Sequence, residues 1–239
     1  MSQFNPKVND EAMEALNLEK QRGRLVVFTK YPTAGAVKTR LIPALGAEGA
    51  TKLHQRLAEY TIAQAQEFLQ ARKNIDVDLE IRFAGSDRQE MADWLGTEYR
   101  YVPQGAGDLG DRMARSITES FAQGYSFIVL IGTDCPAITP DLLSNTFSKL
   151  STADVVIGPA RDGGYYLIGI HQRINDSFSR LFQNIQWSTS KVLLQTLEIA
   201  SRFLFKTEQL PILSDIDRPE DLQYLPKSII QSSNSDIFH

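Results

Sequence analysis

The chain has 239 residues, of which 42% are hydrophobic and 23% are charged, and its formal net charge is −4. This length suits one large α/β domain, and the acidic balance excludes a global basic surface for nucleic acid. The single Cys135 excludes an internal disulfide, and the chain has neither an apolar run of about 18 residues nor a secretory signal, so we expect a cytoplasmic protein without a membrane span.

The two ends of the chain differ in composition from its middle. Residues 1–23 are polar, so we expect a flexible N-terminal arm, and we expect a loose tail over residues 227–239. The range 24–226 is then the single predicted domain.

Short β-branched runs alternate with longer segments of 3.6-residue period from Leu25 onward. This alternation is typical of a mostly parallel sheet flanked by helices. Strands are predicted at 24–30, 77–85, 99–104, 126–132, 154–160 and 164–170. Helices are predicted at 47–72, 87–95, from 108, and at 139–150, the last with Thr139 as N-cap and Pro140 at its first position.

The predicted sheet is mixed, because its last two strands are too close for a parallel crossover. Only the tight turn at 161–164 separates them, so we expect antiparallel pairing there. The strand at 126–132 is almost uniformly apolar, which indicates burial on both faces.

A basic loop follows the first strand and carries Lys30, Lys38 and Arg40 around Gly35. It is not a Walker A loop, because Val37 stands where that motif has glycine. Three cations on a glycine-bearing loop suit a polyphosphate, and the alternative is a solvated surface loop.

Acidic residues follow the later strands. Asp134, after the apolar strand, is placed to hold Mg²⁺ or Mn²⁺, or else it caps the next turn. Asp162 precedes Gly163 and Gly164 in a turn and is a candidate general base or metal partner. Asp215 and Asp217 precede a predicted helix that starts at a proline. Helix capping accounts for the presence of some of these acids, and a role as the second carboxylate ligand of a metal accounts for one of them.

A G-x-G-x-x-G pattern at Gly105, Gly107 and Gly110 raises the alternative of a dinucleotide site, with Asp134 24 residues after Gly110. Asp108 would place the wrong charge beside a pyrophosphate, so we do not favour an oxidoreductase. The histidines form no ligand spacing, and we interpret His54, within a helical pattern, as a surface or packing residue.

Six segments occur in an order that resembles a bacterial family of glycosyltransferases and radical-SAM-associated transferases with a glycosyltransferase-A-type fold. They are FTKYPTAGAVKTRL, GAGDLGDRM, IGTDCPAITPDLL, DVVIGPARDGGYYLIGI, FQNIQWSTSKVLLQTL and LSDIDRPEDL, and the resemblance covers residues 25–225. The chain is more distantly similar to 2-phospho-lactate guanylyltransferase and the molybdenum-cofactor guanylyltransferase. The resemblance implies a three-layer α/β/α nucleotide-diphospho-sugar transferase fold.

The resemblance also implies roles for particular residues. It implies that the basic loop binds phosphates and that Asp134 and Asp217 bind the metal. It also implies that the segment starting at Gln104 lines a mononucleotide pocket. Lys38 and Asp162 are the candidate catalytic residues. The expected acceptor region contains Gly163, Gly164, Tyr165 and Trp187, and the expected nucleotide contacts are Lys30, Gly35, Lys38, Arg40, Gln104, Gly105 and Gly107.

We therefore expect a Mg²⁺-dependent glycosyltransferase that moves a sugar from a nucleotide-diphospho-sugar to a small-molecule acceptor. One alternative is nucleotidyl transfer from an NTP to a phosphorylated small molecule, and another is a nucleotide-binding module without catalysis. Glycosyltransferases of this fold usually carry Asp-x-Asp after the central strand, but here only Asp134 is acidic, as in the nucleotidyltransferases.

Overall fold

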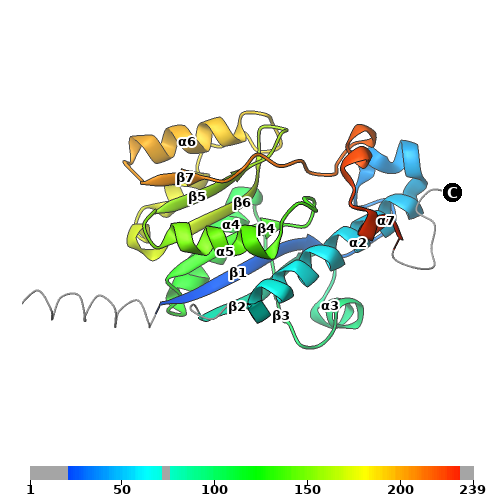
Figure 1. Cartoon of the computed structure of the whole chain (residues 1–239), viewed down its shortest axis with the longest axis horizontal. Helices are drawn as coiled ribbons and strands as arrows, with labels where there is room; N and C mark the ends of the chain where they lie inside the picture. The colour runs from blue at the N-terminus through cyan, green and yellow to red at the C-terminus, as the bar shows by residue number, and fades with distance from the viewer. Residues whose placement is uncertain (1–20, 72–75, 232–239) are drawn as a thin grey trace, which may run out of the picture.

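A seven-stranded sheet with helices on both faces forms the protein (Figure 1). The computed structural model describes residues 21–71 and 76–231. The strand order is β3-β2-β1-β4-β6-β5-β7, and only β6 runs antiparallel to its neighbours β4 and β5. This arrangement confirms the predicted mixed, mostly parallel sheet. The strands are β1 Arg22–Lys30, β2 Asp76–Ala84, β3 Arg100–Pro103, β4 Phe127–Gly132, β5 Val155–Pro159, β6 Tyr165–His171 and β7 Thr207–Gln209.

Helices cover the two faces of the sheet with separate apolar clusters. One cluster joins the sheet to α2 and α5, and the other joins it to α4, α6 and the 3-10 helix η3. The helices are α2 Ile42–Ala71, α3 Arg88–Leu95, α4 Leu109–Ala122, α5 Pro140–Leu150, α6 Val192–Arg202 and α7 Lys227–Gln231, and the 3-10 helices are η1 Thr39–Leu41, η2 Gln172–Ile174, η3 Phe178–Phe182 and η4 Pro219–Tyr224. The three-layer α/β/α prediction is therefore confirmed.

The central strand β4 is buried on both faces, as its apolar run predicts. Ile128 and Leu130 pack on the α4 side, whereas Val129 and Ile131 pack on the α2 and α5 side. Since side chains alternate along a strand, a strand covered by helices on both faces needs apolar residues at every position.

Local sequence signals explain where several helices begin. The Thr139 hydroxyl accepts from the Leu142 amide at 3.2 Å, and Pro140 occupies the first turn of α5, as predicted. The carboxylates of Asp87 and Asp108 form capping boxes at the starts of α3 and α4. The backbone at Gly46 is not helical, so α2 consists of a short helical turn from Ile42 followed, after Gly46, by the long helix that was expected to start at about residue 47.

Three expectations need correction, and one strand was missed. Strand β1 starts at Arg22, inside the segment expected to be a flexible arm. The short strand β7 was not expected, and the predicted helix after Pro219 is the 3-10 helix η4. Helix α7 lies in the expected loose tail, where Ile229 packs with the N-terminal part of α2 (Figure 1). The expectations for residues 1–20 and 232–239 lie outside the described residues.

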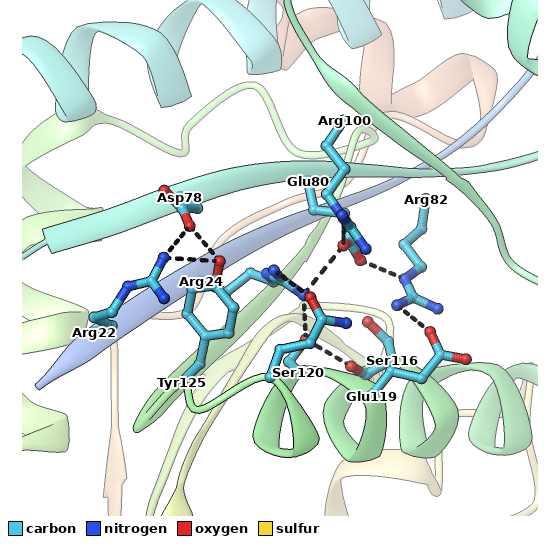
Figure 2. Close-up of polar contacts among 11 residues, drawn as sticks. Arg22, Arg24, Asp78, Glu80, Arg82, Arg100, Ser116, Glu119, Ser120 and Tyr125 are labelled. Atoms are coloured by element: carbon cyan, nitrogen blue, oxygen red, sulfur yellow. Dashed lines mark hydrogen bonds and ion pairs between the residues drawn. The ribbon is translucent and has the colours of Figure 1, made fainter.

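A buried ion cluster holds α4 against β1, β2 and β3 (Figure 2). Glu80 on β2 has no exposed side-chain area, and it contacts Arg24 at 3.2 Å, Arg82 at 2.6 Å and Arg100 at 2.8 Å. Arg82 reaches Glu119 of α4 at 2.6 Å. The cluster therefore fixes the helix whose N-terminus borders the site described below.

In the part of the chain that the structure describes, no helix is both long and apolar enough to cross a membrane.

Candidate functional site

A cavity of about 660 Å³ opens at the carboxyl ends of β1 and β4. Ligands of open α/β sheets bind at this edge, because the loops after parallel strands converge there. The cavity is lined by seven residues that the sequence predicted for the site, namely Lys30, Lys38, Arg40, Gln104, Asp134, Tyr165 and Asp217.

Lys38 and Asp134 form an ion pair at the centre of this edge. The Lys38 ammonium lies 2.6 Å from Oδ1 of Asp134 and also donates to the carbonyl of Ile216. The Lys38 side chain is 3% exposed, and that of Asp134 is 49% exposed. Burial alone would raise the pKa of Asp134, but the charge and hydrogen bond of Lys38 outweigh it and lower that pKa. Asp134 therefore presents a carboxylate to the cavity.

The segment before η4 brings further acids to the same place. The Ile216 amide donates to the Asp134 carbonyl at 2.8 Å, which docks this segment against the end of β4. Asp217 forms an ion pair with Arg40, and its amide donates to Asp221 at 3.0 Å. The structure thus places Asp134 and Asp217, the two predicted metal ligands, in one cavity.

Asp215 is a cavity residue that the predicted site did not include. Its pKa is raised to about 7 because it is buried and because Asp134 and Asp162 add negative charge nearby. The Asp-x-Asp spacing of Asp215 and Asp217 was the available signal, but the sequence alone does not show that both residues line the cavity.

His54 is a second cavity residue that sequence reasoning placed elsewhere. It extends from α2, and its Nε2 lies 2.9 Å from the Lys30 carbonyl. Since that carbonyl only accepts, Nε2 carries the proton. Burial lowers the pKa of His54, so the ring is neutral and positions the end of β1.

Gln104 is buried at the end of β3 with its carboxamide in a fixed orientation. Its Nε2 donates to the carbonyls of Thr29 at 3.0 Å and Arg82 at 3.1 Å. Because carbonyl oxygens only accept hydrogen bonds, the group that faces Thr29 and Arg82 is the amide nitrogen of Gln104. The Oε1 atom therefore faces Arg112, whose guanidinium lies 3.4 Å away. Arg112 also lines the cavity and was not predicted.

Two glycines of the G-x-G-x-x-G pattern shape a loop, and the third lies in α4 close to Trp187. Gly105 and Gly107 have positive φ on an exposed loop whose carbonyls Arg115 binds at 2.7 Å. A Cβ on Gly110 would lie 2.7 Å from Trp187. The Asp108 carboxylate already accepts the Asp111 amide at the start of α4, where a dinucleotide phosphate would bind. These contacts argue against the oxidoreductase alternative.

Several predicted contacts lie near the cavity but are not among its described lining residues, which include Tyr165 but not Gly35, Gly105, Gly107, Asp162, Gly163, Gly164 or Trp187. Asp162 accepts from the Gly164 amide at 2.8 Å and shapes the turn before β6. Trp187 packs edge-on against Tyr165, with ring centroids 6.5 Å apart. Their direct contact with a ligand therefore stays a prediction.

The carboxylates around Asp134 fit a divalent cation. Burial and the charges of Asp134 and Asp162 raise the pKa of Asp215, and added positive charge would relieve this repulsion. Among the described residues, no three His, Cys, Asp or Glu side chains are already arranged around one metal position. Mg²⁺ commonly takes one or two carboxylates together with substrate phosphates, so Asp134 with Asp215 or Asp217 is a sufficient set.

One solved structure is similar enough to share both the fold and the family of this chain. A protein from Desulfovibrio desulfuricans G20, provisionally described as a nucleotide-diphospho-sugar transferase, is 32% identical with a TM-score of 0.78, over 91% of this chain and 93% of that one. No curated protein matches the chain in sequence.

More distant matches show the fold alone. The 4-diphosphocytidyl-2C-methyl-D-erythritol synthase from Anaerococcus prevotii DSM 20548 is 11% identical with a TM-score of 0.55, over 87% of this chain and 95% of that one. A Mycobacterium tuberculosis H37Rv protein in complex with manganese is 16% identical with a TM-score of 0.51, over 87% and 99%. These matches confirm the predicted nucleotide-diphospho-sugar transferase fold.

Residues 63–189 match the family described as "Uncharacterized protein conserved in bacteria (DUF2064)". This match spans more than half of the chain, and the Desulfovibrio protein matches nearly all of it. The chain therefore belongs to this bacterial family of proteins with the nucleotide-diphospho-sugar transferase fold.

Proposed function

We propose that the protein is a metal-dependent transferase that uses a nucleotide-activated donor, and that this donor is a nucleotide-diphospho-sugar. The observation that carries the proposal is the meeting of Lys38, Arg40, Asp134 and Asp217 in one cavity at the carboxyl ends of β1 and β4. Cations beside carboxylates suit a diphosphate held together with a divalent cation.

The proposed roles follow from the contacts of each residue. Lys30, Lys38 and Arg40 bind the diphosphate, and Asp134 with Asp215 or Asp217 holds Mg²⁺ or Mn²⁺. The bound ion supplies neutralising charge at the leaving diphosphate. Lys38 is held from both sides, by Asp134 and by the Ile216 carbonyl, so its charge is positioned before the ligand arrives.

The proposed sugar transfer needs no reactant besides the donor and the acceptor. A hydroxyl oxygen of a small-molecule acceptor forms a bond to the anomeric carbon while the bond from that carbon to the donor phosphate breaks. The nucleoside diphosphate leaves with the electron pair, and the hydroxyl proton passes to a carboxylate. Asp162 stays the proposed base, because it lies close enough to Asp215 to affect its pKa.

Nucleotidyl transfer is the second candidate, and one observation favours it. The acids come from two separate segments, after β4 and before η4, rather than from a single Asp-x-Asp after β4. In that reaction a phosphate oxygen of the acceptor attacks the α-phosphorus of an NTP, and pyrophosphate leaves.

Product analysis separates the candidates. The wild-type protein is incubated with nucleotide-diphospho-sugars or with NTPs and phosphorylated acceptors, each with and without Mg²⁺ or Mn²⁺. Metal-dependent release of a nucleoside diphosphate from one sugar donor is the expected result. Pyrophosphate release from an NTP would instead assign nucleotidyl transfer. Nucleotide binding without formation of any product would show that the protein is a nucleotide-binding module without catalysis.

A further inference from the structure

Strand β4 ends at Gly132, and the space above this glycine is open. A Cβ added at Gly132 would meet no heavy atom within 4 Å. In contrast, a Cβ on any of the other strand glycines, Gly23, Gly158 and Gly169, would meet a neighbour at 2.7, 2.4 and 3.0 Å. Gly132 is also absent from the glycines with positive φ, so neither its backbone nor close packing requires glycine. The missing side chain instead enlarges the cavity that Gly132 lines.

The open space faces the α4 side of the sheet. Gly132 follows Leu130 by two positions, and Leu130 packs with Met113 of α4. On β1, Phe28 pairs in register with Gly132. We call the part of the cavity bounded by Phe28, Leu109, Met113, Leu130 and Gly132 the Gly132 recess. The four side chains of this set are apolar, and Gly132 contributes backbone alone.

Two polar groups border the Gly132 recess. Gln104 has both amide hydrogens engaged by main-chain carbonyls, which leaves Oε1 as an acceptor with a fixed direction. Arg112 lies beside that oxygen and supplies donors. The other side of the same cavity holds Lys38, Arg40 and the carboxylates. A ligand that fills both sides therefore has an anionic end and a flat, largely apolar end with a few hydrogen-bonding atoms.

We propose that Gly132 is a specificity-determining residue, and that the heteroaromatic ring of the donor nucleoside lies over it in the Gly132 recess. This inference rests on the proposed function, which supplies the diphosphate end of the same ligand. A ring buries its faces against Phe28 and Leu109 and directs its edge to Gln104 and Arg112. Any side chain at position 132 would project into the volume that the ring needs.

The test compares Gly132→Ala and Gly132→Val with wild type. Both side chains enter open space, and valine suits a strand, so thermal stability is expected to be unchanged or higher. Affinity is measured by calorimetry with ADP, GDP, CDP and UDP in Mg²⁺, and with inorganic pyrophosphate in Mg²⁺. Pyrophosphate carries the anionic end without a nucleoside and so is the matched control ligand.

The valine variant is expected to lose about 10- to 100-fold in affinity for the nucleoside diphosphate that wild type prefers, and the alanine variant less. Pyrophosphate affinity is expected to stay the same in both variants. Equal nucleotide affinity in wild type and Gly132→Val would overturn the inference and leave the proposed function intact. A fall in the melting temperature of Gly132→Ala would contradict the open space itself. If wild type binds pyrophosphate but no nucleoside diphosphate, both proposals fail.

Discussion

Lys38 reaches Asp134 from a left-handed backbone conformation, with φ of 48° and its ammonium 2.6 Å from the carboxylate. For a residue with a side chain this conformation costs about 1–2 kcal/mol. Such strain persists where the surrounding structure determines it, and it is common at functional sites. The pair therefore indicates that the loop after β1 is shaped to deliver this ammonium to the end of β4.

The first prediction concerns Asp134→Asn, which keeps the shape of the side chain but removes its charge. Metal-dependent turnover is expected to fall at least about 100-fold, since neutralising a developing charge contributes several kcal/mol. Steady-state rates at several Mg²⁺ concentrations measure the effect. Asp176→Asn, at an exposed position, is the control and is expected to keep the wild-type rate. A variant at Asp134 with unchanged metal dependence would exclude this carboxylate from the mechanism.

The sheet was predictable because its signals are local. The apolar run of β4, the cap at Thr139 and the tight turn before β6 each identify an element without knowledge of its neighbours. The start of β1 was missed because its residues are polar and carry no strand pattern. Arg22 is part of the strand because it pairs with Asp76 of β2, and this pairing cannot be seen in the local sequence. The three polar residues of β7 carry no strand pattern for the same reason.

The charged side chains of the site were predictable because loops after parallel strands meet at one edge. His54 and Arg112 were not, since a side chain on a helix reaches this edge only through tertiary packing. Glycine patterns were the weakest guide. Gly107 and Gly163 have positive φ and serve turns, whereas Gly132, which belongs to no glycine-rich pattern, opens the cavity.

A second prediction concerns the buried ion cluster of Figure 2. Glu80→Gln leaves three arginines around Glu80 without their shared negative charge. Removing one partner from a buried ion pair costs about 3–5 kcal/mol, so the free energy of unfolding in urea is expected to fall by that order. Asp76→Asn is the matched control, because Asp76 is 69% exposed and pairs with Arg22 at 3.3 Å. It is expected to cost less than about 1 kcal/mol. Equal effects of the two substitutions would contradict the assigned role of Glu80.

A third prediction is that stability depends on pH through His171. Burial and the nearby charge of Arg173 lower the pKa of His171 to about 4. Its Nδ1 accepts from the Arg173 amide at 2.9 Å, and protonation would remove this acceptor. The unfolded chain binds the proton near its usual pKa of about 6.5, so the contribution is complete above that pH and is lost as the pH falls toward 4.

The size of this contribution is about 3 kcal/mol for a fully buried ring. Urea unfolding at a series of pH values measures it in wild type and in His171→Asn, whose side chain can still accept from the Arg173 amide. The difference in unfolding free energy between the two proteins is expected to shrink as the pH falls from about 6.5 to 4. A difference that does not change over this range would show that His171 titrates normally.

A fourth prediction separates two costs of replacing glycine. Gly163 and Gly124 have φ of 89° and 83°, so alanine is strained at both, by about 1–2 kcal/mol. A Cβ at Gly163 would also lie 2.2 Å from the Ser190 carbonyl, whereas at Gly124 nothing lies within 4 Å. Gly163→Ala is therefore expected to cost roughly 1–3 kcal/mol more than Gly124→Ala in urea unfolding.

The same contact links Gly163 to the cavity. The Gly163 carbonyl accepts from the Leu193 amide at 2.9 Å, and Ser188, two residues before Ser190, lines the cavity. A Cβ at Gly163 must push this loop away, so Gly163→Ala is also expected to weaken the binding of the donor nucleotide, whereas Gly124→Ala is not. If both alanine variants lose the same stability and keep full affinity, the turn before β6 does not position the loop, and the tight approach of Gly163 to Ser190 has no role in the site.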